Sequence, residues 1–135
     1  MIKIANFGKI RKMKIEVSNG EVVDKLTILQ IKLERVKDEA KLRNLRKEYG
    51  ELVRMTSSIM STSDPLYKAL YDINCELWDI EDRIRDLERR KDFSEEFIAT
   101  ARSVYIKNDK RADIKREINI RTSSDLMEEK SYEKY

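Results

Sequence analysis

Two groups of side chains in this sequence have the types and the spacing from which a binding or catalytic site could be built. The first group is acidic and consists of two carboxylate pairs, Glu48 with Glu51 and Glu76 with Asp79. The members of each pair lie three residues apart, and 24 residues separate the two pairs. Carboxylate pairs at this spacing on two facing helices can share a Mg²⁺ ion, because this ion prefers oxygen ligands. Such an ion would shield a triphosphate and activate a water molecule.

The second group is polar and aromatic, and it falls on one flank of each of two expected helices. Its stacking rings, amide groups and guanidinium forks suit a small anionic ligand or an acidic segment of a protein partner. A third expected helix offers Asp24 and Arg35 on its own flank. The predicted binding residues are Asn74, Trp78, Arg85, Arg102, Tyr105, Asn108 and Arg111.

Two structural interpretations compete with a binding site at this flank. In the first, the aromatic side chains are ordinary core, and Asn74 and Asn108 form a hydrogen-bonded pair that fixes helix register. In the second, the flank is a dimer interface, where Tyr, Trp and Arg are enriched. Ala101 and Ala112 on either side of Asn108 would allow another helix to come close. An asparagine in such a contact needs a partner, because leaving it unpaired costs about 1–3 kcal/mol.

Several familiar chemistries lack their residues. The chain has no histidine, which is the commonest general base and metal ligand. With Cys75 as the single cysteine, it has neither the ligands of the usual zinc sites nor a Cys–His or Ser–His nucleophile. It also has no glycine-rich loop that could cradle phosphates. We therefore predict no resident cofactor and no catalytic residue, with Mg²⁺ at the four carboxylates as the alternative.

The composition is typical of long helices that are exposed to solvent. Charged residues make up 41% of the chain and apolar residues 40%, with only three glycines and one proline. No apolar run approaches the ~20 residues that a membrane span requires, and no secretory signal is evident. A lone cysteine forms no internal disulfide, so we expect a cytoplasmic protein that does not engage a membrane.

The net charge of +3 comes from the first twelve residues. This stretch contains Lys3, Lys9, Arg11 and Lys12 and no acidic residue, and the chain from Met13 onward carries a net charge of −1. A nearly neutral body with both signs mixed along it lacks the basic face of a nucleic-acid-binding domain. We therefore do not expect nucleic acid as a partner.

Apolar periodicity predicts four long amphipathic helices. They are expected from near Gly20 to Lys37 and at 39–60, 65–90 and 94–121, and the residues expected to cap them are Ser18, Asp38, Asp64 and Asp92. The third helix is the most regular, with heptad spacing over three heptads at Leu66, Leu70, Ile73, Leu77, Ile80, Ile84 and Leu87.

These elements predict an all-α fold, in which the four helices form antiparallel helical hairpins or a bundle. Alternating apolar residues within 1–17 add a short N-terminal β segment. We divide the chain into an N-terminal extension at 1–12, one helical domain at 13–122 and a C-terminal tail at 123–135, which docking would order. Because the second helix pair is longer than the first, its ends would project from a monomer, and we predict that a second copy covers them in a homodimer.

Four stretches of the sequence together resemble an uncharacterised family of small bacterial and phage proteins that is known only as a domain of unknown function. The stretches are MKIEVSNGEVVDKLTILQIKLERV, INCELWDIEDRIRDLERRKDF, ARSVYIKNDKRADIKREIN and EEKSY. The resemblance covers about residues 13–132 and implies no activity, substrate or catalytic residue. It does suggest Met13 as the natural start, which makes residues 1–12 an upstream extension.

A second and much narrower resemblance concerns the four carboxylates alone. Their pattern is similar to the metal motif of all-α nucleoside-triphosphate pyrophosphatases. The sequence thus supports two hypotheses. The first is a non-enzymatic, dimeric helical interaction module that binds a protein partner or a small anionic ligand. The alternative is a Mg²⁺-dependent pyrophosphatase-like hydrolase.

Overall fold

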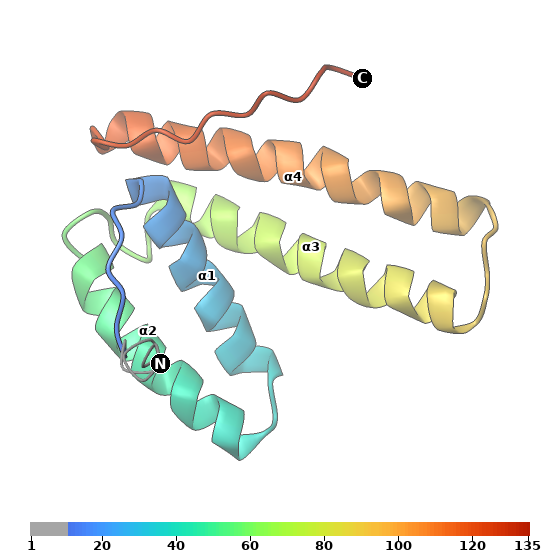
Figure 1. The fold of residues 1–135 in the computed structure, drawn as a ribbon, viewed down its shortest axis with the longest axis horizontal. Coiled ribbons are helices and arrows are strands. Elements are labelled where there is room, and N and C mark those ends of the chain that lie inside the picture. The colour runs from blue at the N-terminus through green and yellow to red at the C-terminus, as the bar shows by residue number, and fades with distance from the viewer. Residues whose placement is uncertain (1–10) are drawn as a thin grey trace, which may run out of the picture.

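The fold consists of four α-helices in chain order. The computed structural model describes residues 11–135, and in this range it contains α1 at Asn19–Arg35, α2 at Glu39–Thr56, α3 at Pro65–Arg89 and α4 at Glu95–Arg121 (Figure 1). The described residues contain no strand, so the predicted all-α class is confirmed. Each helix begins and ends within a few residues of the position that the apolar periodicity predicted.

Three of the four helices begin at the predicted cap. The side chains of Ser18, Asp38 and Asp64 accept hydrogen bonds from backbone amides in the first turns of α1, α2 and α3. The predicted cap at Asp92 is wrong, because Ser94 is the residue before α4 and its side chain makes no cap bond. Asp92 instead accepts a hydrogen bond from the Ser94 amide at 3.1 Å, which stabilises the turn before the helix.

The predicted N-terminal β segment is not found in the part of it that the structure describes. Residues 11–17 form neither helix nor strand, and the rest of that segment lies outside the described residues. Strand pairing would require a second extended segment beside 13–17, and none accompanies it within residues 11–135. Alternation alone therefore gave a wrong prediction here.

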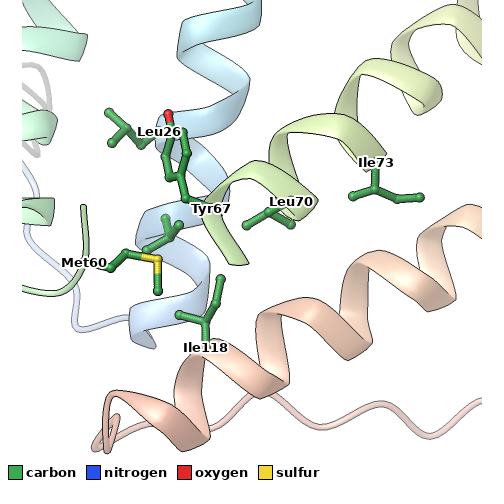
Figure 2. Close-up of a cluster of buried hydrophobic side chains, with 7 residues drawn as sticks. Leu26, Met60, Tyr67, Leu70, Ile73 and Ile118 are labelled. Atoms are coloured by element: carbon green, nitrogen blue, oxygen red, sulfur yellow. The ribbon is translucent and has the colours of Figure 1, made fainter. Parts of the chain in front are cut away.

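The helices meet at one end of the molecule (Figure 1). α3 and α4 lie side by side along their length, α1 packs against the other three helices, and α2 lies against α1 and diverges from α3. At the meeting point a cluster of buried apolar side chains forms the core, and Figure 2 shows them pointing toward one another from α1, α3, α4 and the α2–α3 loop. The cluster consists of Val23, Leu26, Met60, Tyr67, Leu70, Ile73 and Ile118.

Beyond this core, α3 and α4 continue together, and the end of α1 reaches them through Arg35 at Trp78 and Asp79 (Figure 1). We call residues 77–107 the arm. Leu87 is the one fully buried residue of the arm. Leu77, Ile80 and Ile84, which continue the heptad pattern, are only partly buried. The arm therefore leaves apolar surface in contact with water.

The C-terminal tail, residues 123–135, turns back after α4 and runs along it without regular secondary structure (Figure 1). Ser124 ties its start to α1, because its hydroxyl accepts a hydrogen bond from the Asn19 amide at 2.9 Å. Within residues 11–135, no helix is apolar enough over a sufficient length to traverse a lipid bilayer.

Candidate functional site

The centre of the polar structure is Asp24, an acidic residue of α1 that is 1% exposed. Its carboxylate lies where α1, α3 and α4 meet, one turn along α1 from the close contact of Gly20 with α4. Asn74 of α3 donates a hydrogen bond to its Oδ1 at 2.9 Å, and Arg111 Nε of α4 donates to the same oxygen at 2.9 Å. A second guanidinium nitrogen of Arg111 donates to Oδ2. One carboxylate thus joins three helices.

The partners of Asp24 also hold one another. Asn74 Nδ2 donates to the Thr27 hydroxyl at 2.8 Å, and that hydroxyl donates to the main-chain carbonyl of Asp24 at 2.7 Å. The hydrogen bonds from Arg111 to Asp24 raise the pKa of the guanidinium further above its already high value. Because a bidentate guanidinium–carboxylate pair fixes both position and orientation, it locks α4 against α1.

Lys115 extends this cluster to the tail. It lies four residues after Arg111 on the same face of α4, and its side chain is 10% exposed. Its Nζ contacts Glu21 Oε2 at 2.7 Å, Glu128 Oε2 at 3.0 Å and Asp24 Oδ2 at 3.8 Å. Burial lowers the pKa of Lys115, but hydrogen bonds to Glu21 and Glu128 outweigh burial, so the pKa is raised and the lysine stays charged.

We call Asp24, Thr27, Asn74, Arg111 and Lys115 the junction. Among the described residues, no buried side-chain nitrogen or oxygen lacks a hydrogen-bond partner. A general base must reach a substrate proton, and the carboxylate of Asp24 is 1% exposed and already accepts three hydrogen bonds from Asn74 and Arg111. The arrangement is therefore suited to positioning helices rather than to proton transfer.

Gly20 brings the beginning of α1 directly onto α4. Its amide donates to Asn119 Oδ1 at 2.6 Å, and a β-carbon at this position would lie 2.5 Å from the Lys115 carbonyl oxygen. Only glycine permits this approach of two backbones. The sequence suggested only a loose helix start at this glycine, whereas the structure gives it a packing role.

A cavity of about 920 Å³ lies between α4 and the tail. Three of the seven predicted binding residues, Tyr105, Asn108 and Arg111, line it together with Lys115 and the tail residues Lys130, Tyr132, Glu133, Lys134 and Tyr135. The Tyr105 and Tyr135 rings meet edge to face, with centroids 4.9 Å apart, and close one end of the cavity. Arg102 lies beside it and donates to the Tyr105 hydroxyl at 3.2 Å.

The predicted Asn74–Asn108 pair is wrong. Asn74 is buried but bonds to α1, whereas Asn108 is exposed and its nearest polar contact is Arg111 Nη1 at 3.5 Å. The interpretation of Asn108 as a buried residue in a close contact between two helices of one chain is wrong for the same reason. Rotation of α4 turns Arg111 toward α1, and Asn108 faces the tail instead.

Three predicted binding residues lie away from the cavity, and the first of them, Asn74, belongs to the junction. Trp78 faces α1, where the Arg35 guanidinium lies 5.7 Å from its ring centroid. Arg85 lies on the outer surface of the arm and pairs with Glu81 at 3.3 Å. The structure therefore splits the predicted flank into four places: the junction, the cavity, the contact of Trp78 with α1 and the outer surface of α3.

The four carboxylates of the alternative metal site do not come together. α2 and α3 do not face each other, and three of the acids have separate cationic partners: Glu48 pairs with Lys25, Glu76 with Lys107 and Asp79 with Arg35. No group of three His, Cys, Asp or Glu residues within 11–135 is arranged to hold a metal ion. The predicted site required α2 and α3 to face each other, and this assumption was wrong.

Sequence reasoning missed Glu21, Lys115 and Glu128. Two signals pointed to Lys115. It follows Arg111 by one helical turn, and it stands among apolar residues, between Ile114 and Ile118, on the face that packs on α1. Nothing in the sequence indicated that the tail would return to it.

The fold and the junction define an all-helical protein whose buried polar groups hold its helices and tail in place. The chain belongs to the DUF6165 family, a family of unknown function whose model matches residues 13–135. No significant match was found among curated proteins or solved structures. The family resemblance predicted from the sequence is thus confirmed.

Proposed function

We propose that this protein is a non-enzymatic helical interaction module that forms a homodimer through the arm and binds a protein partner or a small anionic ligand at the cavity between α4 and the tail. In this proposal the two pairs of successive helices act as antiparallel hairpins. The hairpin of α1 and α2 supports the junction, and the hairpin of α3 and α4 provides the dimer surface.

The observation that carries the proposal is the incomplete burial of the arm. Its apolar positions repeat with heptad spacing, which is the pattern of helices that pack against other helices. Phe93 is 56% exposed and Ile98 is 55% exposed. Two helices packed only on each other bury one face each, and a second arm would cover the remaining apolar side chains.

The cavity supplies the features for a ligand. Lys130 and Lys134 bring positive charge to its tail side, whereas the charges of Arg111 and Lys115 on its α4 side are paired with Asp24, Glu21 and Glu128. Tyrosine rings provide stacking surface at the same place. A non-enzymatic role is supported by the junction, because its ionisable side chains are already bonded to one another.

The test compares two glutamate substitutions at similarly exposed isoleucines of α4. Ile98 lies in the arm with 55% exposure, and Ile120 lies outside it with 62% exposure. Burial of an isoleucine contributes about 1.5–3 kcal/mol, so Ile98→Glu should weaken dimerisation at least tenfold. Ile120→Glu should leave it unchanged. Sedimentation velocity measures the dimerisation of both variants and of the wild type. The protein concentration runs from about 1 to 200 µM, a range that brackets micromolar affinity. Equal effects of the two variants, or a wild-type monomer throughout, would contradict the proposal.

A further inference from the structure

We propose that the C-terminal tail occupies the α4 surface as an intramolecular stand-in for a partner, and that the partner is an acidic, extended peptide segment which displaces it. The inference rests on the proposed function, since it concerns the same cavity. It adds the chemistry of the partner and an autoinhibitory role for the tail.

The contacts of the tail define the chemistry that this surface accepts. Two adjacent carboxylates meet two adjacent cations of α4: Glu128 pairs with Lys115 at 3.0 Å, and Glu129 pairs with Arg116 at 3.0 Å. Six residues further along, the Tyr135 ring packs edge to face on Tyr105. The surface thus binds an extended segment with paired acidic residues and an aromatic residue beyond them.

The tail is held in a way that allows it to leave. Its two tyrosine side chains are mostly in water, with Tyr132 81% exposed and Tyr135 78% exposed. The last backbone-to-backbone hydrogen bond before the C-terminus joins the Ser124 amide to the Asn119 carbonyl at 2.9 Å, so the tail adds no strand to any other element. Segments with few buried apolar contacts open at low cost.

The connection to α4 has the form of a hinge. Ser123 has a φ of 52°, in the left-handed region that a serine adopts rarely. The Ser124 amide closes this helix end by donating to the Asn119 carbonyl, so the end of α4 stays in place when the residues beyond it detach. Ser124 makes the last backbone-to-backbone hydrogen bond of the tail to α4, and its hydroxyl contacts α1. Beyond it the described tail makes no further hydrogen bond of this kind, so residues 125–135 form one detachable unit.

The tail also covers the residues that a partner would use. Tyr105, Asn108, Arg111 and Lys115 line the cavity on the α4 side, and the tail forms the opposite wall. A tethered segment competes at a high effective concentration, so the observed affinity for a partner falls by the fraction of molecules in which the tail is docked. Weakening the tail contacts should therefore strengthen partner binding.

The experiment uses the full-length chain and a synthetic peptide of residues 125–135, DLMEEKSYEKY, as the probe. The peptide is titrated into ¹⁵N-labelled protein, and the amide signals of Tyr105 and Arg116 report its binding. The tail variant Glu129→Gln/Tyr135→Ala removes one ion pair and one ring contact but keeps Glu128 on Lys115. We expect it to bind the peptide about tenfold more tightly than the wild type does. The matched control is Asp125→Asn/Ser131→Ala, because both residues are exposed, neither lines the cavity and neither has an ion pair or ring partner within residues 11–135. It should bind as the wild type does.

Each outcome has a defined meaning. A loss of peptide binding when Arg116→Glu is added to the tail variant supports the inference, because it removes the cation that receives the second carboxylate. Equal affinity of the wild type and the tail variant overturns the inference and leaves the proposed function standing. Peptide binding by neither protein overturns both the inference and the cavity as a binding site. A dimer that disappears in the tail variant would show exchange of tails between two copies, and it would overturn the claim of a separate partner.

Discussion

Replacement of Asp24 by asparagine tests the junction most sharply, because the two side chains have nearly the same shape. The asparagine would keep one oxygen for Asn74 but would turn an amide group toward the Arg111 guanidinium, so that two donors face each other. It would also leave the charges of Arg111 and Lys115 without the carboxylate between them. Removal of one partner of a buried ion pair costs about 3–5 kcal/mol. Since the Arg111 side chain is 27% exposed and can regain some water, we expect about 3 kcal/mol, at the lower end of that range.

Urea unfolding followed by circular dichroism at 222 nm measures this loss. For a chain of 135 residues, about 3 kcal/mol corresponds to a fall in Tm of roughly 10 °C. The control is Asp72→Asn, which changes an exposed carboxylate of α3 and should alter stability by less than about 0.5 kcal/mol. Adding Arg111→Gln to Asp24→Asn should cost less than the sum of the single changes by about 1–3 kcal/mol, because the two side chains act as a pair. If Asp24→Asn stays within about 1 kcal/mol of the wild type, the junction does not hold the helices together as described.

The remaining predictions concern the close backbone contact, the two asparagines and the tail. Gly20→Ala should destabilise the protein by about 1–3 kcal/mol in the same unfolding assay, because its β-carbon would meet a backbone carbonyl of α4 at 2.5 Å. Gly50→Ala, whose β-carbon meets nothing within 4 Å, should instead stabilise α2 by about 0.5–1 kcal/mol, and equal effects at the two glycines would refute this packing argument. Asn74→Leu should destabilise the protein by about 2 kcal/mol or more, since it removes two buried hydrogen bonds. Asn108→Leu should change stability little, because Asn108 is exposed. A larger loss of stability at Asn108 than at Asn74 would contradict the structure. Hydrogen bonds from Lys130, within the tail, and from Lys115 of α4 hold the pKa of Glu128 at about 2, below its usual 4.5. Only the Lys115 contact depends on docking, and its contribution should be fully present above pH 4.5 and lost as the pH falls toward 2; NMR signals of the tail that stay unchanged across this range would count against the ion pair.

The sequence predicted the helices well because their signals are local. Capping side chains at Ser18, Asp38 and Asp64 bond to amides two or three residues away, so sequence and structure carry the same information. No strand forms at residues 11–17, the described part of the predicted β segment, because a strand depends on a partner that its own alternation does not reveal. The predicted cap at Asp92 lies two residues before the observed cap position at Ser94. Turn hydrogen bonds compete at helix ends and commonly shift them by this amount.

The candidate site was predicted in its residue types but not in its pairing. The sequence placed Asn74 and Arg111 on the correct flanks, but the partner that joins them is Asp24, 50 residues before one and 87 before the other. Which residue of α4 turns toward α1 depends on the rotation of that helix, and a weakly amphipathic helix does not specify this rotation. The tail contact of Lys115 was beyond prediction because the path of the tail depends on tertiary contacts.

The carboxylate motif shows how spacing alone can mislead. Pairs of acids three residues apart lie on one side of a helix, and the chain contains 26 acidic residues in which such pairs recur. Whether two pairs face each other depends on which helices pack together. Here α3 packs against α1 and α4, so Asp79 meets Arg35 and Glu76 meets Lys107 instead of a shared ion.

The central claim is that the arm is the surface through which this protein assembles. Hydrogen–deuterium exchange of the wild type at a dilute and a concentrated protein solution tests it directly, since amides in an interface are protected only when the partner is bound. We predict that exchange of residues 77–107 slows at the higher concentration, while exchange in α1 and α2 stays the same. Sedimentation should first show a mass of twice 16.1 kDa in the concentrated sample and not in the dilute one. Equal exchange of the arm in these two samples would then contradict the claim, because the dimer would form elsewhere.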